Sequence, residues 1–226
     1  MKSPSRSSGR VRNRLIAAGA IVVLVVAMLL CTRFETPESL ANIGPEQFNA
    51  TTEATELFDR AKAELPEAAD PLDEVLPAAQ ASIAAAAEQF EAVSPSEGSY
   101  DFAVTATGTV TPESTAESLR LEVEGLSGET PVIVPLTTAV NGTIVRDAMG
   151  FRFGDAPGQT QYQYVGDEIK KLIQTDVVAP LGDPTQLVGQ TVTVTGVLNV
   201  TATGGGDTVP AAKPANIQPV VIEVAA

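Results

Sequence analysis

The sequence predicts an α+β fold behind an N-terminal transmembrane helix, and three patterns along the chain predict it. Residues 15–32 form an apolar run of 18 residues without a charge. Residues 45–93 then repeat apolar side chains at steps of three and four, which is typical of amphipathic helices. From Tyr100 onward the period changes to two, which is typical of half-buried strands.

The apolar run is long enough to cross a bilayer as a helix, because the lower limit is about 17 residues. Lys2 and four arginines precede it, and no acid occurs before Glu35. Basic flanks stay in the cytoplasm. We therefore expect residues 1–13 to be a cytoplasmic basic tail, residues 14–32 to be the anchor, and the rest to be extracytoplasmic.

Three fates of the apolar run are open: a cleaved signal peptide, a lipoprotein signal or a retained anchor. The apolar region of a signal peptide is only about 7–15 residues long, so the length favours a retained single-pass signal anchor. Cys31 stands where a lipidated cysteine would stand. The bulky Leu30 precedes it in place of the small residue of a lipobox, so the sequence favours Cys31 as an unmodified residue of the anchor.

The part of the chain after the apolar run is strongly acidic. It carries all 28 acidic residues and only 8 of the 14 basic ones beyond residue 33, a formal net charge of −20. Such a surface repels phosphate backbones, so nucleic acid is not an expected partner. The chain has one cysteine and no histidine. An internal disulfide is excluded, and we expect no metal and no cofactor.

Residues 33–97 are predicted to form a helical stalk or subdomain that contains a pair of helices. Pro66 and Pro71 are predicted to break the segment. Asp70 and Pro71 are predicted to be the N-cap and the first residue of the second helix. Pro77 is predicted to kink this second helix or to mark its start.

Residues 98–226 are predicted to form an OB-like β-barrel domain. Alternating apolar residues indicate strands near residues 100–107, 119–124, 131–140, 192–200 and 217–224. Between the third and fourth strands, residues 160–175 are predicted to be a helix, with Thr160 and Gln163 at the spacing of a capping box. Three strands, one helix and two strands is the element order of a five-stranded OB-type barrel.

Four stretches of this chain resemble a known bacterial family. They are Gly-Thr followed by Arg-Asp-Ala in residues 141–153, the tyrosines of 161–165, Gly-x-x-Val-x-Val-x-Gly at 189–196, and Pro-Val-x-x-Glu-Val at 219–224. The sequence resembles, over roughly residues 34–225, a predicted-lipoprotein family of unknown function, domain-of-unknown-function family 2291. The family pattern has a short apolar strand ending in Phe after Arg-Asp-Ala. The resemblance implies an extracytoplasmic protein, often encoded beside sugar-type ABC transport systems.

Arg146 and Asp147 are the sharpest candidate site residues. Arginine can bind an anion or a carboxylate bidentately, so the pair is a candidate ligand site. The alternative, which we favour, is a structural arginine paired with a nearby acid, with Asp147 capping a turn. Tyr162 and Tyr164 do not share one helix face, so one alternative is that at least one of them is exposed and available to a partner. The alternative that we favour is that both pack partly on the barrel.

We expect a membrane-anchored, extracytoplasmic accessory protein without enzymatic activity. Its expected partner is another extracytoplasmic protein, such as an ABC transporter component. A domain that binds a sugar or a carboxylate at Arg146 is the alternative. A hydrolase with two catalytic carboxylates is a remote alternative, and its candidate acids are Asp101, Glu122, Glu124, Asp147, Asp155 and Asp167.

Overall fold

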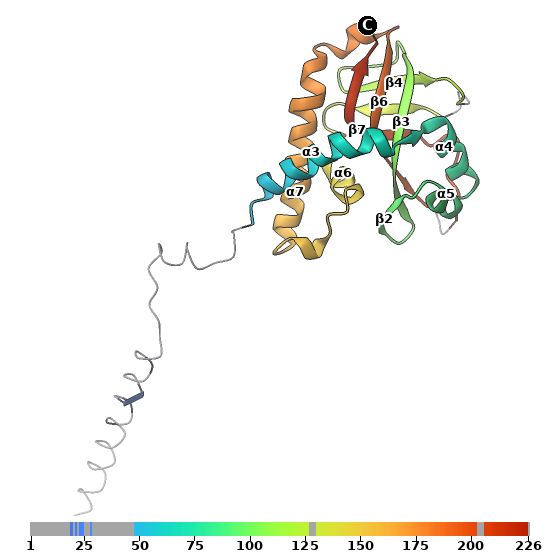
Figure 1. The fold of residues 1–226 in the computed structure, drawn as a ribbon. Coiled ribbons are helices and arrows are strands. Elements are labelled where there is room, and N and C mark those ends of the chain that lie inside the picture. Colours follow the sequence, from blue (N-terminus) through green and yellow to red (C-terminus); the bar gives the residue numbers. More distant parts are fainter. Residues whose placement is uncertain are drawn as a thin grey trace, which may run out of the picture. The chain divides into compact units, whose positions relative to one another are not determined.

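The computed structural model describes residues 48–126, 130–202 and 206–225 (Figure 1). It also describes five positions of the apolar run, all helical and exposed: Gly19, Ile21, Val23, Leu24 and Met28. The predicted cytoplasmic tail, Cys31 and the other residues of the expected anchor lie outside the described residues. Within the described part of the chain, no helix combines the length and the apolar character that a bilayer crossing requires.

Residues 48–226 form one compact unit. Its α-helices are α3 (Ala50–Ala68), α4 (Leu72–Ala81), α5 (Ile83–Gln89), α6 (Gly142–Ala148) and α7 (Gln159–Leu172). A π-helical segment, η2 (Ile173–Val178), continues α7, and the 3-10 helices are η1 (Phe153–Asp155), η3 (Ala179–Leu181) and η4 (Pro184–Leu187). The strands are β1 (Asp70–Pro71), β2 (Val93–Ser96), β3 (Ser99–Val110), β4 (Ser118–Val123), β5 (Val132–Pro135), β6 (Thr191–Thr201) and β7 (Ala215–Val224).

Five of these strands close into a barrel. They follow the order β3-β4-β5-β7-β6, and β6 pairs back onto β3 from Ser99↔Thr201 to Thr109↔Thr191. The β5–β7 pair is parallel, and the other pairs of the barrel are antiparallel. This arrangement confirms the predicted five-stranded OB-type barrel. Two α-helices, α6 and α7, lie between its third and fourth strands, where the sequence predicted one.

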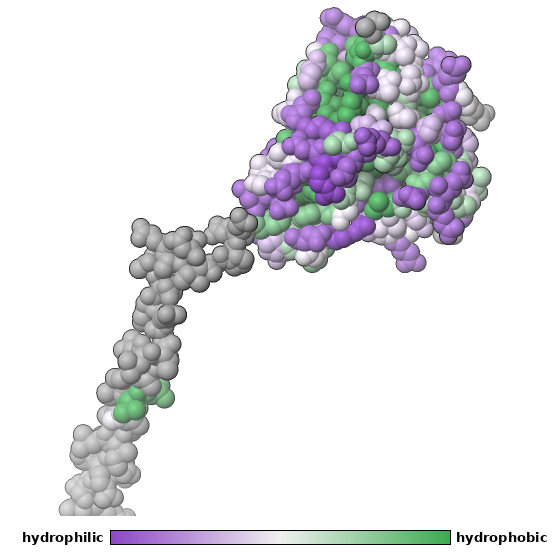
Figure 2. All heavy atoms as spheres, in the orientation of Figure 1, coloured by the Kyte–Doolittle hydropathy of each residue, from purple (hydrophilic) through white to green (hydrophobic). Residues whose placement is uncertain are grey.

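The alternation in β3 separates two hydrophobic cores. Phe102 and Val104 point into the barrel and pack with α4 and α5, which contribute residues such as Val75 and Ile83 to the same core. The outer face of the barrel packs against α3, α6 and α7 in a second core. The helices α3 to α5 therefore share their cores with the barrel, and Figure 2 shows hydrophilic residues over the exposed side of α3.

The predicted starts of two helices are wrong. Asp70 and Pro71 form the short strand β1, which pairs in parallel with β3, so α4 begins at Leu72 and has no side-chain cap. Likewise α7 begins at Gln159 after Gly158, without a side-chain cap, so Thr160 lies inside the helix and is not its N-cap.

The predicted break at Pro71 is confirmed, because α3 ends at Ala68 and α4 begins at Leu72, whereas Pro66 does not end its helix and Pro77 does not begin one. Pro66 lies in the last turn of α3, which continues to Ala68, because losing one hydrogen bond there leaves the helix otherwise intact. Pro77 lies inside α4, and the interruption comes instead at Ser82. The Ser82 backbone N–H closes α4, while its hydroxyl accepts from the Ala85 N–H and caps α5.

Candidate functional site

Two glycines bring α6 and α7 into close contact on the outer face of the barrel. A Cβ on Gly142 would collide with the backbone of Gly166, and a Cβ on Gly166 would lie 2.6 Å from Thr143 Cγ2. Asn141 caps α6, since its Oδ1 accepts from the Thr143 N–H at 3.1 Å. The close crossing places Arg146 of α6 directly against the first turn of α7.

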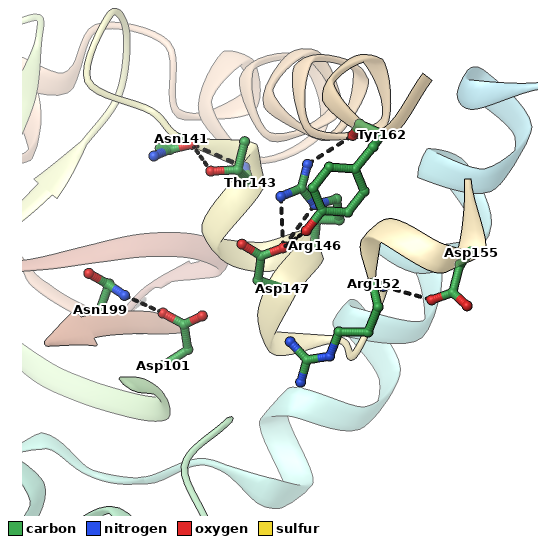
Figure 3. Close-up of polar contacts among 9 residues, drawn as sticks. All are labelled: Asp101, Asn141, Thr143, Arg146, Asp147, Arg152, Asp155, Tyr162 and Asn199. Carbon is green, nitrogen blue, oxygen red and sulfur yellow. Dashed lines mark hydrogen bonds and ion pairs between the residues drawn. The ribbon is translucent and has the colours of Figure 1, made fainter. Parts of the chain in front are cut away.

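Arg146 forms a buried network with Asp147 and Tyr162 (Figure 3). Its Nε and Nη2 donate to Asp147 Oδ1 at 2.9 and 2.8 Å, and its Nη1 donates to the Tyr162 carbonyl oxygen at 2.8 Å. The guanidinium carbon lies 3.5 Å from the centroid of the Tyr162 ring. The Tyr162 hydroxyl donates to the same Asp147 oxygen at 2.9 Å. Arg146 is only 4% exposed. Its charge is neutralised inside the protein by the Asp147 carboxylate.

Aromatic side chains extend this network toward the surface. The rings of Phe151 and Tyr162 stack with centroids 6.0 Å apart, and the Phe153 ring meets Tyr162 edge-on at 5.7 Å. Phe48, directly before α3, lies 6.5 Å from Phe151. Phe153 is 57% exposed and Tyr164 is 55% exposed, whereas Tyr162 is partly buried. Of the two α7 tyrosines, Tyr164 is exposed and Tyr162 is not, which fits the alternative that the sequence did not favour.

A second polar group lies on the strands beside α6. Asp101 of β3 is 2% exposed, and the Asn199 Nδ2 of β6 donates to its Oδ1 at 2.6 Å. The same amide nitrogen is 3.0 Å from the Ser99 hydroxyl. The Oδ2 atom of Asp101 is buried and has no hydrogen-bond partner among the described residues. Sequence reasoning included Asp101 only as one acid among six, and it missed Asn199 as a site residue.

Burial controls the ionisation of this region. The pKa of Asp101 is raised to about 6, mainly by desolvation; the Asn199 hydrogen bond opposes this shift, the Asp147 charge adds to it and the Arg152 charge opposes it. The pKa of Tyr162 is raised mainly by desolvation and also by its hydrogen bond to Asp147. The structure thus brings two of the predicted carboxylates, Asp101 and Asp147, into electrostatic contact on one face of the barrel.

The remaining predicted carboxylates lie in other places. They lie in a groove of about 920 Å³ along β4 (Glu122, Glu124), at the last residue of η1 (Asp155) and in a hollow between α3 and α7 (Asp167). The Asp155 carboxylate accepts from the Arg152 backbone N–H at 2.6 Å and therefore has a local capping role. Within the described residues, no group of three or more acidic, histidine or cysteine side chains is arranged to hold a metal ion.

These features define an α+β protein with a closed OB-type barrel and a buried arginine–carboxylate network between two crossed helices. The chain belongs to the family described as predicted periplasmic lipoprotein (DUF2291), whose model matches residues 21–218. This confirms the resemblance seen in the sequence. Membership indicates an extracytoplasmic, membrane-associated protein, and the family carries no assigned function.

The fold has a counterpart among solved structures. The crystal structure of an OB-fold protein from Thermotoga maritima matches with a TM-score of 0.65 and 16% sequence identity, over 80% of this chain and 100% of that chain. At this identity the likeness shows the shared fold alone. No curated protein matches this sequence. The short apolar strand that the family pattern implied after Arg-Asp-Ala is absent, because residues 149–152 form a loop that leads into η1.

Proposed function

We propose that this chain is a non-enzymatic accessory protein that binds another extracytoplasmic protein through the α6–α7 end of its barrel domain. The observation that carries the proposal is the exposure of Phe153 and Tyr164. Among the described residues, Phe153 and Tyr164 are the two aromatic side chains that are exposed to solvent. Exposed aromatic side chains are enriched where proteins bind each other.

The buried network supports this role because it fixes the aromatic surface in place. The Phe153 ring contacts the Tyr162 ring edge-on. The Arg146 guanidinium packs against the face of the Tyr162 ring, and the Tyr162 hydroxyl donates a hydrogen bond to Asp147. A rigid aromatic side chain loses little conformational entropy when a partner covers it. On this proposal, Arg146 and Asp147 act as the support of a docking surface.

A component of a sugar-type ABC transport system is the partner that we propose. The support is the setting implied by the family likeness and the extracytoplasmic location indicated by membership. The domain itself is acidic, with a formal charge of −20 beyond residue 33, so a partner with a basic rim around an apolar centre would suit it.

We propose that a retained single-pass anchor over residues 15–32 attaches the protein to the membrane. Acylation of Cys31 is the competing attachment, because the family is described as a lipoprotein family. Metabolic labelling with an alkyne fatty acid distinguishes the two. The retained anchor predicts no label on the full chain and an intact N-terminus. A label that disappears in Cys31→Ser would contradict it.

Direct ligand binding by Arg146 is the alternative that the sequence left open. Three of its nitrogens already donate to Asp147 and Tyr162, and the side chain is 4% exposed. A carboxylate ligand would have to replace Asp147 and lift Tyr162 from the guanidinium. These contacts favour the structural role for Arg146.

Site-specific photo-crosslinking in living cells tests the proposed docking surface. A photoreactive amino acid at position 153 or 164 is expected to yield a discrete crosslinked product that contains a transport component. The matched control is position 122 on β4, which is exposed and lies in the groove away from α7. Equal crosslinking at all three positions, or none at 153 and 164, would refute the proposal.

A further inference from the structure

A hollow of about 550 Å³ lies between α3 and α7, beside the exposed Tyr164 ring. The two helices contact each other where they cross (Figure 1). Ala50 and Thr51, in the first turn of α3, have short side chains and leave the space between the helices unfilled. The wall on α7 consists of Tyr164, Asp167, Glu168, Lys170, Lys171 and Gln174.

The nitrogen donors that line the hollow are already bonded within the protein. The Lys171 ammonium group pairs with the Glu168 carboxylate at 2.6 Å. Lys170 Nζ donates to the Thr138 carbonyl oxygen at 3.0 Å, and Gln174 Nε2 donates to a backbone carbonyl oxygen at 3.1 Å. These side chains therefore have internal partners before any other protein reaches the hollow.

Asp167 and Tyr164 are the polar groups of the α7 wall that remain available. Asp167 is exposed and forms no hydrogen bond or ion pair with the described residues. It acts on Lys171 electrostatically, but the Lys171 ammonium group is bonded to Glu168. Tyr164 is 55% exposed. Residues three apart on a helix are surface neighbours with Cβ atoms about 5–6 Å apart, so α7 presents a carboxylate next to an aromatic face.

The buried network of this protein shows which side chain uses a carboxylate and an aromatic face together. The Arg146 guanidinium carbon lies 3.5 Å from the centroid of the Tyr162 ring, and Asp147 accepts from Nε and Nη2 of the same arginine. A guanidinium group can stack and pair at once because it is planar and has donors along its edge. A lysine ammonium group has no such plane.

We propose that the partner protein inserts an apolar side chain into this hollow, and that an arginine beside that side chain stacks on Tyr164 and pairs with Asp167. The inference rests on the docking function proposed above and specifies the chemistry of the partner. A basic residue is favoured over an acidic one by the formal charge of −20 beyond residue 33. The internal bonds of Lys170 and Lys171 also leave the hollow without a cation for an acidic partner residue.

The apolar side chain and the arginine have complementary effects. The apolar side chain fills the space beside Ala50 and Thr51 and excludes water from the arginine–Asp167 pair. A charge pair is stronger where water is excluded. Tyrosine and arginine are also enriched among the residues that dominate binding energy at interfaces.

Photo-crosslinking from the opposite wall of the hollow tests the proposal in living cells with the full chain. A photoreactive amino acid at position 51, which is exposed and lies on α3, is expected to capture the same partner protein as position 153. Mass spectrometry of the product is expected to place the crosslink within a few residues of an arginine of the partner.

Variants read out at position 51 assign the contacts, at low expression where the crosslink yield follows the affinity. Asp167→Asn is expected to lower the yield about tenfold, and the matched control Glu122→Gln should leave it unchanged. Tyr164→Leu should lower the yield about threefold or more, whereas Tyr164→Phe keeps the aromatic face and should bind like the wild type. Asp167, Tyr164 and Glu122 are exposed, so these variants are expected to fold.

The outcomes separate this inference from the docking function. A partner captured at position 153 but not at 51, or an unchanged yield in Asp167→Asn, overturns the inference and leaves the docking function standing. No product at 153 and 164 overturns both. A product at 51 that contains only this chain, whether residues 33–47 or a second copy, also overturns the inference.

A charge exchange tests the arginine itself. Replacing the partner's arginine by aspartate and making Asp167→Arg should each lower the yield about tenfold, and the two changes together should restore it. Failure of the double change to restore the yield contradicts a direct pair between the arginine and Asp167.

Discussion

Replacing Asp101 by asparagine is expected to change how the free energy of unfolding depends on pH. Burial raises the pKa of Asp101 from 3.8 to about 6 in the folded protein. Ionising this carboxyl group is therefore harder in the folded state than in the unfolded state. The resulting destabilisation is absent well below pH 4, grows as the pH rises to about 6 and stays constant above that.

The magnitude follows from the size of the shift. About two pKa units correspond to about 3 kcal/mol at 1.36 kcal/mol per unit, most of which develops between pH 4 and pH 7. In Asp101→Asn, the Asn199 Nδ2 can still donate to the introduced carbonyl oxygen. The introduced NH₂ group lacks an acceptor, and this costs about 1–3 kcal/mol at every pH. The pH-dependent part of the difference between the two proteins is therefore the informative quantity.

Urea denaturation followed by far-UV circular dichroism measures this difference at pH 4, 6 and 8. Relative to the wild type, Asp101→Asn should gain about 2–3 kcal/mol of unfolding free energy between pH 4 and pH 8. Glu122→Gln, which changes an exposed carboxylate on β4, should show almost no such gain. If the difference between wild type and Asp101→Asn stays constant across this range, the reasoning about desolvation is wrong.

Two further predictions concern the helix crossing and the tyrosines. Gly166→Ala should lower the unfolding free energy by about 1–3 kcal/mol, because its Cβ would meet Thr143 Cγ2. Gly154→Ala is the control and should change the unfolding free energy little, because Gly154 has open space around it. Equal effects of the two substitutions would contradict the close helix crossing. Tyr162→Phe should lower the unfolding free energy by about 1–2 kcal/mol, because the hydrogen bond to Asp147 is lost. Tyr164→Phe should leave thermal unfolding nearly unchanged, and a larger effect of Tyr164→Phe than of Tyr162→Phe would contradict the described network.

The barrel was predictable from the sequence because its strands alternate cleanly. In β3 and β6, every second residue from Phe102 or Val192, except Gly108 and Gly196, enters one core, so the pattern predicts both the strand and its inner face. The helix starts were less predictable. Capping residues such as Asp70 recur in turns and strand ends, and local sequence does not show that β1 pairs with a strand more than 30 residues away.

The candidate site was only partly predictable, because its parts meet through tertiary structure. Arg146 and Asp147 are adjacent in sequence, and their ion pair agrees with the structural role that the sequence favoured. Asp101 and Asn199 are 98 positions apart and meet only through the β3–β6 register. Helix α6 was missed because it is short, begins at a glycine and contains β-branched residues, which are typical of strands.

Side-chain footprinting in native membranes tests the proposed docking surface most directly. Hydroxyl-radical labelling of Phe153 and Tyr164 would be compared between membranes from cells and the purified full chain. Val188 and Val224, each 38% exposed, serve as internal references. Protection of the two aromatic residues in membranes, with unchanged labelling of the valines, is the predicted result. Equal labelling of Phe153 and Tyr164 in both preparations would contradict the claim that a partner covers the α6–α7 end.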